Sequence, residues 1–435
     1  MSGVLRDFVE RMGTPLGRRS LMMNAFRRTW PVLSRAAGLY RRTVLRRTRI
    51  VTVVGSYGKT STAYAVLTAL GGAPHPGLQR GGMSFLARNL LRIGILDRHA
   101  VLEVGILRPG EMAPYAQMIR PDIVAMTWIG SEHNRSFGTK EAIRLEKAEM
   151  VKALPSSGLA VLNGDDPNVL RTRELTRARV VTYGFGENCD VRASEVSLAD
   201  WPHGTHFTVH AGGEERRMSI RLIGRPMVYP VLAAVAVAQA EGLSLDQVLP
   251  GLSALTPIPG RMEPVQLPSG AIVLRDDFKS ALETVDAALD VLAEIPAKRR
   301  IVVLGRVSEP MGSQGDIYRR LGARIASIAT KAILVCGTTS NYPLSAGAVA
   351  AGMPRSSIVK AGDNIFAAVK ALEGDLGPGD VVLVKGRTDQ RLDRITFSLV
   401  GRAVGCRLSV CRTKVASCYH CPMLEQGWGR SRPAQ

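Results

Sequence analysis

The chain has 435 residues, of which 46% are hydrophobic and 22% are charged. This length and composition can fill two or three hydrophobic cores, and they exclude a wholly disordered chain, a collagen-like chain and a disulfide-stapled miniprotein. The 57 Lys and Arg outnumber the 37 Asp and Glu, so the formal net charge of +20 favours anionic partners such as nucleotides, nucleic acid or an acidic membrane surface.

Residues 1–48 predict a basic helical extension. Residues 1–50 hold twelve Arg, no Lys and two acidic residues, which together supply about half of the net charge. Two alternatives stay open for this extension: a helix packed on the rest of the protein, or a helix whose Arg side chains contact an anionic membrane surface. Because the remaining chain is only mildly basic and few aromatic residues lie among these arginines, nucleic acid is disfavoured as a partner.

The hydropathy pattern predicts neither a transmembrane helix nor a signal peptide. No apolar run reaches the ~18–20 residues that a membrane span needs. Arg residues interrupt the apolar residues near the N-terminus, so the uninterrupted apolar core of a signal peptide is missing. We therefore expect a cytoplasmic protein, with peripheral contact at the inner membrane face as the second alternative.

From residue 49 the chain alternates strand-like and helical segments. Continuous apolar strands that alternate with helices are typical of a parallel, doubly wound sheet. A region of shorter alternating runs at 180–222 predicts antiparallel strands, and a helix follows at 231–240. The predicted strands of the parallel part lie at 50–54, 100–104, 123–127 and 159–163, with helices at 60–70 and 139–154.

Pro257, Pro259 and Gly260 predict a linker, after which the alternation restarts with apolar runs at 271–274, 300–305, 333–336 and 381–384. The expected fold class is α/β, with a P-loop parallel-sheet ATPase domain followed by a smaller Rossmann-like domain. The predicted boundaries are 1–48 for the extension, 49–256 for the ATP-binding domain, 257–400 for the C-terminal domain and 401–435 for a basic, cysteine-containing tail.

The segment 51–61, VTVVGSYGKTS, predicts a phosphate-binding loop. A hydrophobic strand runs into glycines that let successive backbone N–H groups and a helix N-terminus face phosphate. Lys59 would reach the β- and γ-phosphates, and the Thr60 hydroxyl would hold Mg²⁺. Val53 stands where the full Walker pattern has its first glycine, so this is a shortened G-x-x-G-K-T form. The predicted ATP-binding residues of the loop are Gly55, Ser56, Gly58, Lys59, Thr60 and Ser61.

This shortened loop resembles that of the Mur ligase family, the ATP-dependent amide ligases of peptidoglycan and folate chemistry. Further motifs follow in the family's order across roughly residues 49–400. The segment 101–111, VLEVGILRPGE, is similar to the branch that adds D-alanyl-D-alanine to the UDP-muramoyl tripeptide. The segments 163–167, 259–263 and 384–386 resemble the family's later motifs. The resemblance implies an ADP-forming ligase of cell-wall peptide synthesis.

The resemblance also implies roles for individual residues. Glu103 takes the position of a strand-end carboxylate that holds Mg²⁺, and a carboxylate beside the loop would also complete a Mg²⁺ shell on physical grounds. His133 takes the position of a second-metal ligand, and Lys147 that of a carbamylated lysine. With Lys59, these two are the expected catalytic residues. Arg261 and Asp276 are the expected cofactor contacts of the C-terminal domain.

Several features depart from the family pattern, among them the segment 276–280, DDFKS, where the family has Asp-Asp-x-x-Asn, and Arg306, where an acidic strand end is expected. Pro230 stands near the place of an Asn that contacts adenine in the family. The 48 residues before the phosphate-loop strand are too few for the family's N-terminal domain, which binds the UDP-sugar and needs ~100 residues. A UDP-linked substrate is therefore not implied by the sequence.

Four cysteines gather near the C-terminus with the spacing Cys406-x4-Cys411-x6-Cys418-x2-Cys421. A Cys-x2-Cys pair places two thiolates on one turn and is a good zinc half-site, whereas the other spacings are irregular. A structural Zn²⁺ site, an iron–sulfur cluster and free reduced cysteines are the alternatives.

The leading functional hypothesis is an ATP-dependent carboxylate–amine ligase that acts on small-molecule or peptide substrates through an acyl phosphate. A poly-amino-acid ligase of the polyglutamate or cyanophycin type is an alternative within the same class. A non-catalytic ATP-binding regulatory protein on the same fold is an alternative from another class, and a nucleic-acid-binding ATPase would rest on charge alone.

Overall fold

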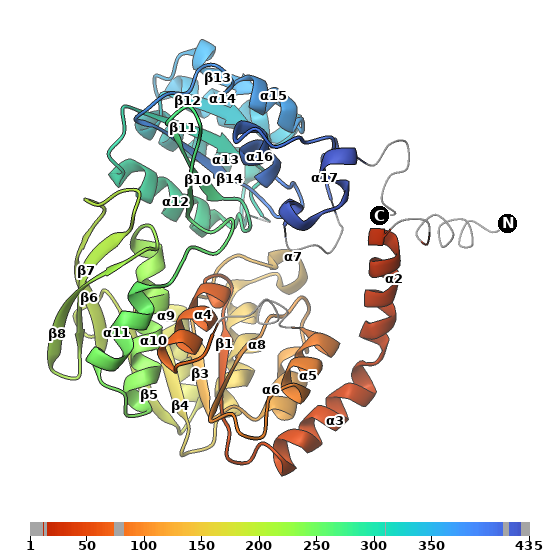
Figure 1. The fold of residues 1–435 in the computed structure, drawn as a ribbon, viewed down its shortest axis with the longest axis vertical. Helices are drawn as coiled ribbons and strands as arrows, with labels where there is room; N and C mark the ends of the chain where they lie inside the picture. The colour runs from red at the N-terminus through yellow and green to blue at the C-terminus, as the bar shows by residue number, and fades with distance from the viewer. Residues whose placement is uncertain (1–11, 13–14, 74–81, 309, 412–416, 428–435) are drawn as a thin grey trace. The chain divides into compact units, whose positions relative to one another are not determined.

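The computed structural model describes residues 12, 15–73, 82–308, 310–411 and 417–427. The chain forms two compact units (Figure 1): one is Ala25–Thr256, and the other is Pro257–Gln435 together with Met1–Asn24. Residues 25–48 of the predicted extension therefore group with the ATP-binding region. Each unit is built around one sheet.

The sheet of the Ala25–Thr256 unit has eight strands in the order β2-β1-β3-β4-β5-β6-β7-β8. The strands from β2 to β6 pair in parallel, and β6, β7 and β8 pair antiparallel, so the predicted antiparallel region at 180–222 is confirmed from β6 onward, whereas β5 at its start pairs in parallel. The strands are β1 (Arg49–Val54), β2 (His99–Glu103), β3 (Ile123–Met126), β4 (Leu159–Asn163), β5 (Arg179–Gly184), β6 (Val191–Ser197), β7 (Thr205–Ala211) and β8 (Glu214–Ile220).

Helices cover both faces of this sheet, because both faces of its parallel strands are apolar. In β1, Val51 and Val53 belong to the core under α4, α10 and α11, whereas Ile50 and Val54 belong to the core under α3, α5, α6 and α8. Alternate side chains of a strand point to opposite faces, so continuous apolar strands need two helical layers. The helices of this unit are α3 (Trp30–Thr43), α4 (Lys59–Ala69), α5 (Met83–Leu91), α6 (Met112–Ile119), α7 (Asn134–Phe137), α8 (Lys140–Lys152), α9 (Pro167–Leu170), α10 (Val228–Ala240) and α11 (Leu245–Ser253), and α2 (Pro15–Arg28) spans the boundary between the units after Asn24.

Helix α3 packs on the protein core. Ala37 and Leu45 are fully buried, and Trp30, Leu33 and Tyr40 pack against the same cluster. The buried Arg41 guanidinium donates to the carbonyl oxygens of Ile119 (3.0 Å) and Arg120 (3.0 Å) and to a carboxylate oxygen of Asp122 (2.8 Å). The first of the two alternatives for the extension, a helix packed on the protein, therefore holds for α3.

Arg41→Ala is expected to lower the free energy of unfolding by about 3 kcal/mol, because it leaves a partly buried carboxylate and several carbonyl groups without their partner. Urea unfolding of full-length protein measures this change. Arg42→Ala is the matched control, since Arg42 is the exposed neighbour on the same helix. Equal stability of the two variants would contradict the anchoring role of Arg41.

The second sheet has six strands in the order β13-β12-β11-β14-β10-β9, and all pairs are parallel except β10 with β9. The sequence pattern did not predict β9 and β13, which are short, half-buried edge strands without a continuous apolar run. The strands are β9 (Glu263–Gln266), β10 (Ile272–Asp276), β11 (Arg299–Leu304), β12 (Lys331–Leu334), β13 (Ile358–Lys360) and β14 (Asp380–Lys385).

The helices of this unit are α12 (Leu282–Glu294), α13 (Gln314–Ile328), α14 (Thr338–Ala350), α15 (Ile365–Lys370), α16 (Asp393–Leu399) and α17 (Met423–Gln426). The predicted α/β class, with a larger parallel sheet followed by a smaller Rossmann-like sheet, is confirmed.

Candidate active site

The phosphate loop lies between the buried strand β1 and helix α4. Gly58 has a φ of 82° and occupies the N-cap position of α4, a conformation that a side chain disfavours. At Gly55 a Cβ atom would lie 1.9 Å from the Thr127 Oγ1 atom, so only glycine fits against this hydroxyl. The two glycines that predicted the loop are therefore required by its geometry.

Hydrogen bonds fix the loop to the end of the neighbouring strand β3. The Ser56 amide donates to the Trp128 carbonyl (2.6 Å), and the Gly130 amide donates to the Ser56 hydroxyl (3.0 Å). The Thr127 hydroxyl donates to the Tyr57 carbonyl (2.6 Å). The loop is thus held in one shape before a ligand binds, which lowers the entropic cost of binding.

Two lysines converge on one carbonyl oxygen of the loop. The Lys59 ammonium donates to the carbonyls of Gly55 (2.8 Å) and Ser56 (3.0 Å), and Lys147 from α8 also donates to Gly55 (2.9 Å). The Lys147 residue is only 2% exposed. Burial, and after it the nearby charge of Lys59, holds the pKa of the Lys147 amine well below its usual value. The structure therefore places a lysine with a strong tendency to lose its charge beside the phosphate loop.

Thr60 and Glu103 meet at the same edge of the sheet. Strand β2 runs parallel to β1 with Val53 opposite Glu103, so the carboxylate lies beside the start of α4. The Thr60 hydroxyl donates to a Glu103 carboxylate oxygen at 2.7 Å. A hydroxyl and a carboxylate are the oxygen ligands that Mg²⁺ prefers, so this pair fits the ion. In the described part of the chain no three His, Cys, Asp or Glu side chains are grouped as metal ligands, so phosphate oxygens and water would have to complete the shell.

The structure connects His133 to the loop through Glu132. The His133 Nε2 atom lies 3.7 Å from one Glu132 carboxylate oxygen, and the other oxygen lies 4.0 Å from the Lys59 ammonium. Glu132 is 8% exposed. Glu132 was not among the predicted site residues, although an acidic residue directly before a candidate metal-binding histidine was a usable signal. Metal binding by His133 stays a prediction.

Arg261 and Asp276 belong to the Pro257–Gln435 unit. The Asp276 carboxylate pairs at 2.8 Å with the ammonium of Lys385, which is 1% exposed, and the Arg261 guanidinium lies 4.3 Å from the centre of the Phe278 ring. The predicted cofactor contacts of Arg261 and Asp276 stay predictions. Lys385, at the end of β14 opposite Asp276, is a further charged residue here that was not among the predicted site residues.

The four tail cysteines are free thiols, and Cys406, Cys411 and Cys418 are buried. Cys406 packs with Cys421, Leu408 and Met423 in a small apolar cluster. Burial raises the pKa of the Cys418 thiol. Since no metal-ligand group of three is found among the described residues, the structure gives no support for zinc, and that site stays a prediction.

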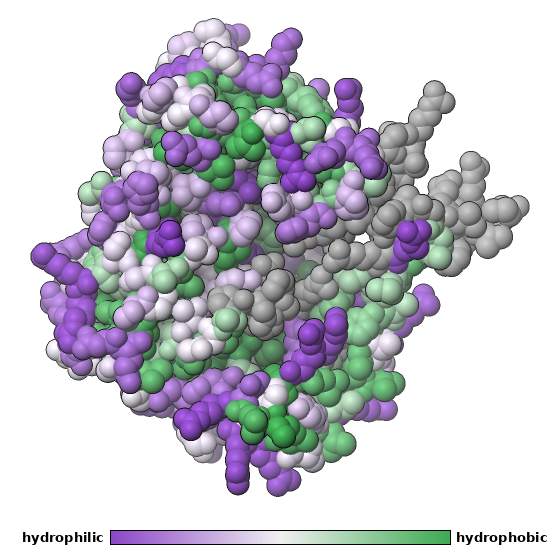
Figure 2. Space-filling view, viewed as in Figure 1, coloured by the Kyte–Doolittle hydropathy of each residue, from purple (hydrophilic) through white to green (hydrophobic). Residues whose placement is uncertain are grey.

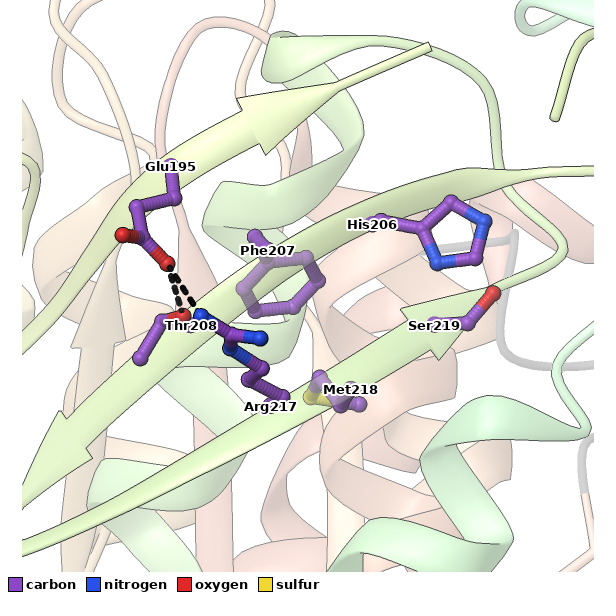
Figure 3. Close-up of a pocket in the computed structure, with 7 residues that line it drawn as sticks. All are labelled: Glu195, His206, Phe207, Thr208, Arg217, Met218 and Ser219. Atoms are coloured by element: carbon purple, nitrogen blue, oxygen red, sulfur yellow. Dashed lines mark hydrogen bonds and ion pairs between the residues drawn. The ribbon is translucent and has the colours of Figure 1, made fainter. Parts of the chain in front are cut away.

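A separate hollow of about 470 Å³ lies on the antiparallel strands (Figure 3). The Glu195 carboxylate in it is already paired, because it accepts a hydrogen bond from Thr208 (2.8 Å) and lies 3.9 Å from Arg217. None of the predicted site residues lines it, so it is separate from the phosphate loop. The lining residues are Glu195, His206, Phe207, Thr208, Arg217, Met218 and Ser219.

Comparisons with known proteins agree with these features. Residues 53–238 match the Mur ligase middle domain, and residues 260–388 match the Mur ligase, glutamate ligase domain. The chain is 31% identical over 374 residues to the UDP-N-acetylmuramoyl-tripeptide–D-alanyl-D-alanine ligase of Mycobacterium tuberculosis. The aligned region covers 81% of this chain and 72% of the relative.

Solved structures share the fold. MurF from Acinetobacter baumannii superposes with a TM-score of 0.74 at 20% identity over 86% of this chain and 81% of that chain. The MurF ligase from Thermotoga maritima in complex with ADP gives a TM-score of 0.72 at 21% identity, and the match covers 86% of this chain and 83% of that chain. With both domain matches and a relative above 30% identity, the chain belongs to the Mur ligase family of ATP-dependent amide-bond ligases.

Proposed function

We propose that the protein joins a muramoyl-peptide carboxylate to the amine of an amino acid or dipeptide, in the manner of the D-alanyl-D-alanine-adding relatives. The observation that carries this proposal is the convergence of Lys59, Lys147 and the Thr60–Glu103 pair on the fixed phosphate loop. In the proposed reaction the carboxylate oxygen attacks the γ-phosphorus of ATP, ADP leaves, and the amine then displaces phosphate from the acyl phosphate.

The chain's own residues act by position and charge. The loop amides and the Lys59 ammonium face phosphate oxygens, where they stabilise the negative charge of the transferred group. The Thr60–Glu103 pair would hold Mg²⁺, which when bound neutralises phosphate charge. A carbamate formed on the Lys147 amine, which contacts the Gly55 carbonyl, would add a negative charge beside the phosphate loop. Arg261 and Asp276 are proposed as further nucleotide contacts.

Measuring ADP release with pooled cell-wall precursors and amino acids tests this function. We expect ADP only when an acid and an amine are present together, and mass spectrometry should show a single condensation. A ladder of products would instead favour the poly-amino-acid alternative. Release of no ADP with any pair of substrates would contradict the ligase proposal and favour the non-catalytic alternative.

We also propose that the outer face of α3 contacts anionic lipid on the cytoplasmic side of the membrane. Val32 (70% exposed) and Leu39 (56%) lie on this face with exposed Arg35 and Arg42 at helical spacing, and exposed Arg46 follows after the helix ends at Thr43. Hydrophobic and hydrophilic residues are interspersed over α3, at the lower right of Figure 2. No helix among the described residues is long and apolar enough to cross a membrane.

The Arg42→Ala/Arg46→Ala double variant is expected to bind phosphatidylglycerol vesicles about 30-fold more weakly than the unaltered protein, because each basic residue near an anionic surface contributes roughly 1 kcal/mol. Co-sedimentation at increasing salt measures the effect, with phosphatidylcholine vesicles as the neutral control. Arg217→Ala removes an arginine from strand β8 and should bind normally. If the double variant pellets like the unaltered protein, α3 has only a structural role.

A further inference from the structure

A tight turn between α5 and β2 carries two exposed aliphatic side chains at its tip. The Asp97 amide donates to the Gly94 carbonyl (3.2 Å), and the Gly94 amide donates to a carboxylate oxygen of Asp97 (2.7 Å), so the turn closes on itself. Ile95 is 68% exposed and Leu96 is 90% exposed. Turn tips normally carry Gly, Pro, Asn, Asp or Ser, so two large aliphatic residues at this place do not serve the turn itself.

The base of this turn is fixed on both sides. Before the turn, Ile93 is buried, and its carbonyl oxygen accepts a hydrogen bond from the Tyr40 hydroxyl of α3 (2.8 Å). After the turn, the Arg98 carbonyl accepts the backbone amide of Arg49 at the start of β1 (2.8 Å). The exposed pair therefore projects from a fixed base beside α3.

Arginines surround the tip. Arg92 and Arg98 flank the turn, Arg46 and Arg47 shortly precede β1, and all four are exposed. Because β1 and β2 pair in parallel from their first residues, both pairs of arginines lie at the same edge of the sheet. The carboxylate of the turn's acidic residue is already bonded to a backbone amide. The tip therefore presents apolar side chains within a rim of positive charge.

An anionic bilayer matches this tip better than a protein partner does. A bilayer offers an apolar interior beneath negatively charged headgroups, so it suits both the aliphatic pair and the arginines. A stable protein interface buries ~800 Å² on each partner, which is far more than two side chains on a protruding turn can supply.

We propose that Ile95 and Leu96 insert into the acyl region of an anionic bilayer. The inference rests on the lipid contact proposed for α3 and adds an apolar part of binding, which salt does not screen. The turn lies at the amino ends of β1 and β2, whereas the phosphate loop follows the carboxyl end of β1. A protein bound in this way keeps its phosphate loop turned away from the bilayer.

Vesicle binding at high salt tests the insertion. In about 0.5 M NaCl, the Ile95→Ser/Leu96→Ser variant should bind phosphatidylglycerol vesicles at least about tenfold more weakly than the unaltered protein. Leu107→Ser is the matched control, because Leu107 is 55% exposed and lies beyond the opposite end of β2. This control should bind normally.

A tryptophan at the tip reports its depth directly. Vesicles with brominated acyl chains should quench the fluorescence of Leu96→Trp more than that of the unaltered protein. Leu107→Trp should show no added quenching. Since Trp keeps the tip apolar, this measurement decides the question even if the double serine variant folds poorly.

The outcomes separate this inference from the proposed contact of α3. Normal high-salt binding by a folded double serine variant, or equal quenching of Leu96→Trp and Leu107→Trp, would overturn the insertion. Self-association that the serine substitutions abolish while vesicle binding stays normal would assign the tip to an interface between two copies. If the unaltered protein binds only at low salt and through Arg42 and Arg46, the contact of α3 stands and the insertion is wrong. If it binds anionic vesicles at no salt concentration, both have failed.

Discussion

Lys59→Ala is expected to reduce ATP turnover at least about a thousandfold, because a preorganised charge at a transferring phosphoryl group stabilises the transition state more than the ground state. The Lys59 ammonium contacts the carbonyls of Gly55 and Ser56 and lies near Glu132. The variant also leaves the buried Glu132 carboxylate without this ion pair, so a loss of stability is expected beside the loss of turnover, and the two must be measured separately.

Phosphate release in the presence of acid and amine substrates measures this loss, and circular dichroism checks the fold. Lys152→Ala is the matched control, since Lys152 ends α8 as an exposed residue paired with Glu149. Near-normal turnover by a folded Lys59→Ala protein would remove the phosphate-loop assignment. If the activity of the Lys152→Ala protein falls by as much as that of Lys59→Ala, the effect is not specific to the loop.

Lys147→Ala is expected to abolish most activity, and formate or acetate should restore part of it. A neutral lysine amine attacks CO₂, a C–N bond forms, a proton is released, and a carbamate results. The lowered pKa of the buried Lys147 amine favours the neutral form that this reaction needs. A small carboxylate can enter the space left by the side chain and replace the negative charge of the carbamate.

Two measurements separate a carbamate from a structural lysine. Rescue should depend on the concentration of the added carboxylate, and chloride at equal ionic strength should give none. In the unaltered protein, isotope-labelled bicarbonate should produce a carbamate signal in the NMR spectrum that Lys147→Ala lacks. Full activity of Lys147→Ala would exclude the residue from the site, and loss without rescue or signal would leave it only a role in holding the loop at Gly55.

The local sequence determined the phosphate loop and the fold class. In the segment 51–61 the apolar strand, the two glycines and the following Lys59-Thr60 occur within one short stretch, so their physical requirements can be read together. The same holds for Glu103, which ends an apolar run and therefore lies at a sheet edge. Continuous apolar strands predicted two helical layers because both faces of such a strand must be buried.

Only the tertiary structure decided which distant groups share one site. Lys147 lies in a charged segment that resembles a solvated helix, and its burial against the Gly55 carbonyl depends on how α8 packs. Glu132 gains Lys59 as a neighbour from strand order, which places β1 beside β3, and the Trp128 and Tyr229 rings meet because α10 packs on the sheet. The packed face of α3 likewise depends on residues near 119–122. Burial and contact between residues far apart in the chain arise from the packing of whole elements, and a single sequence records the elements but not their arrangement.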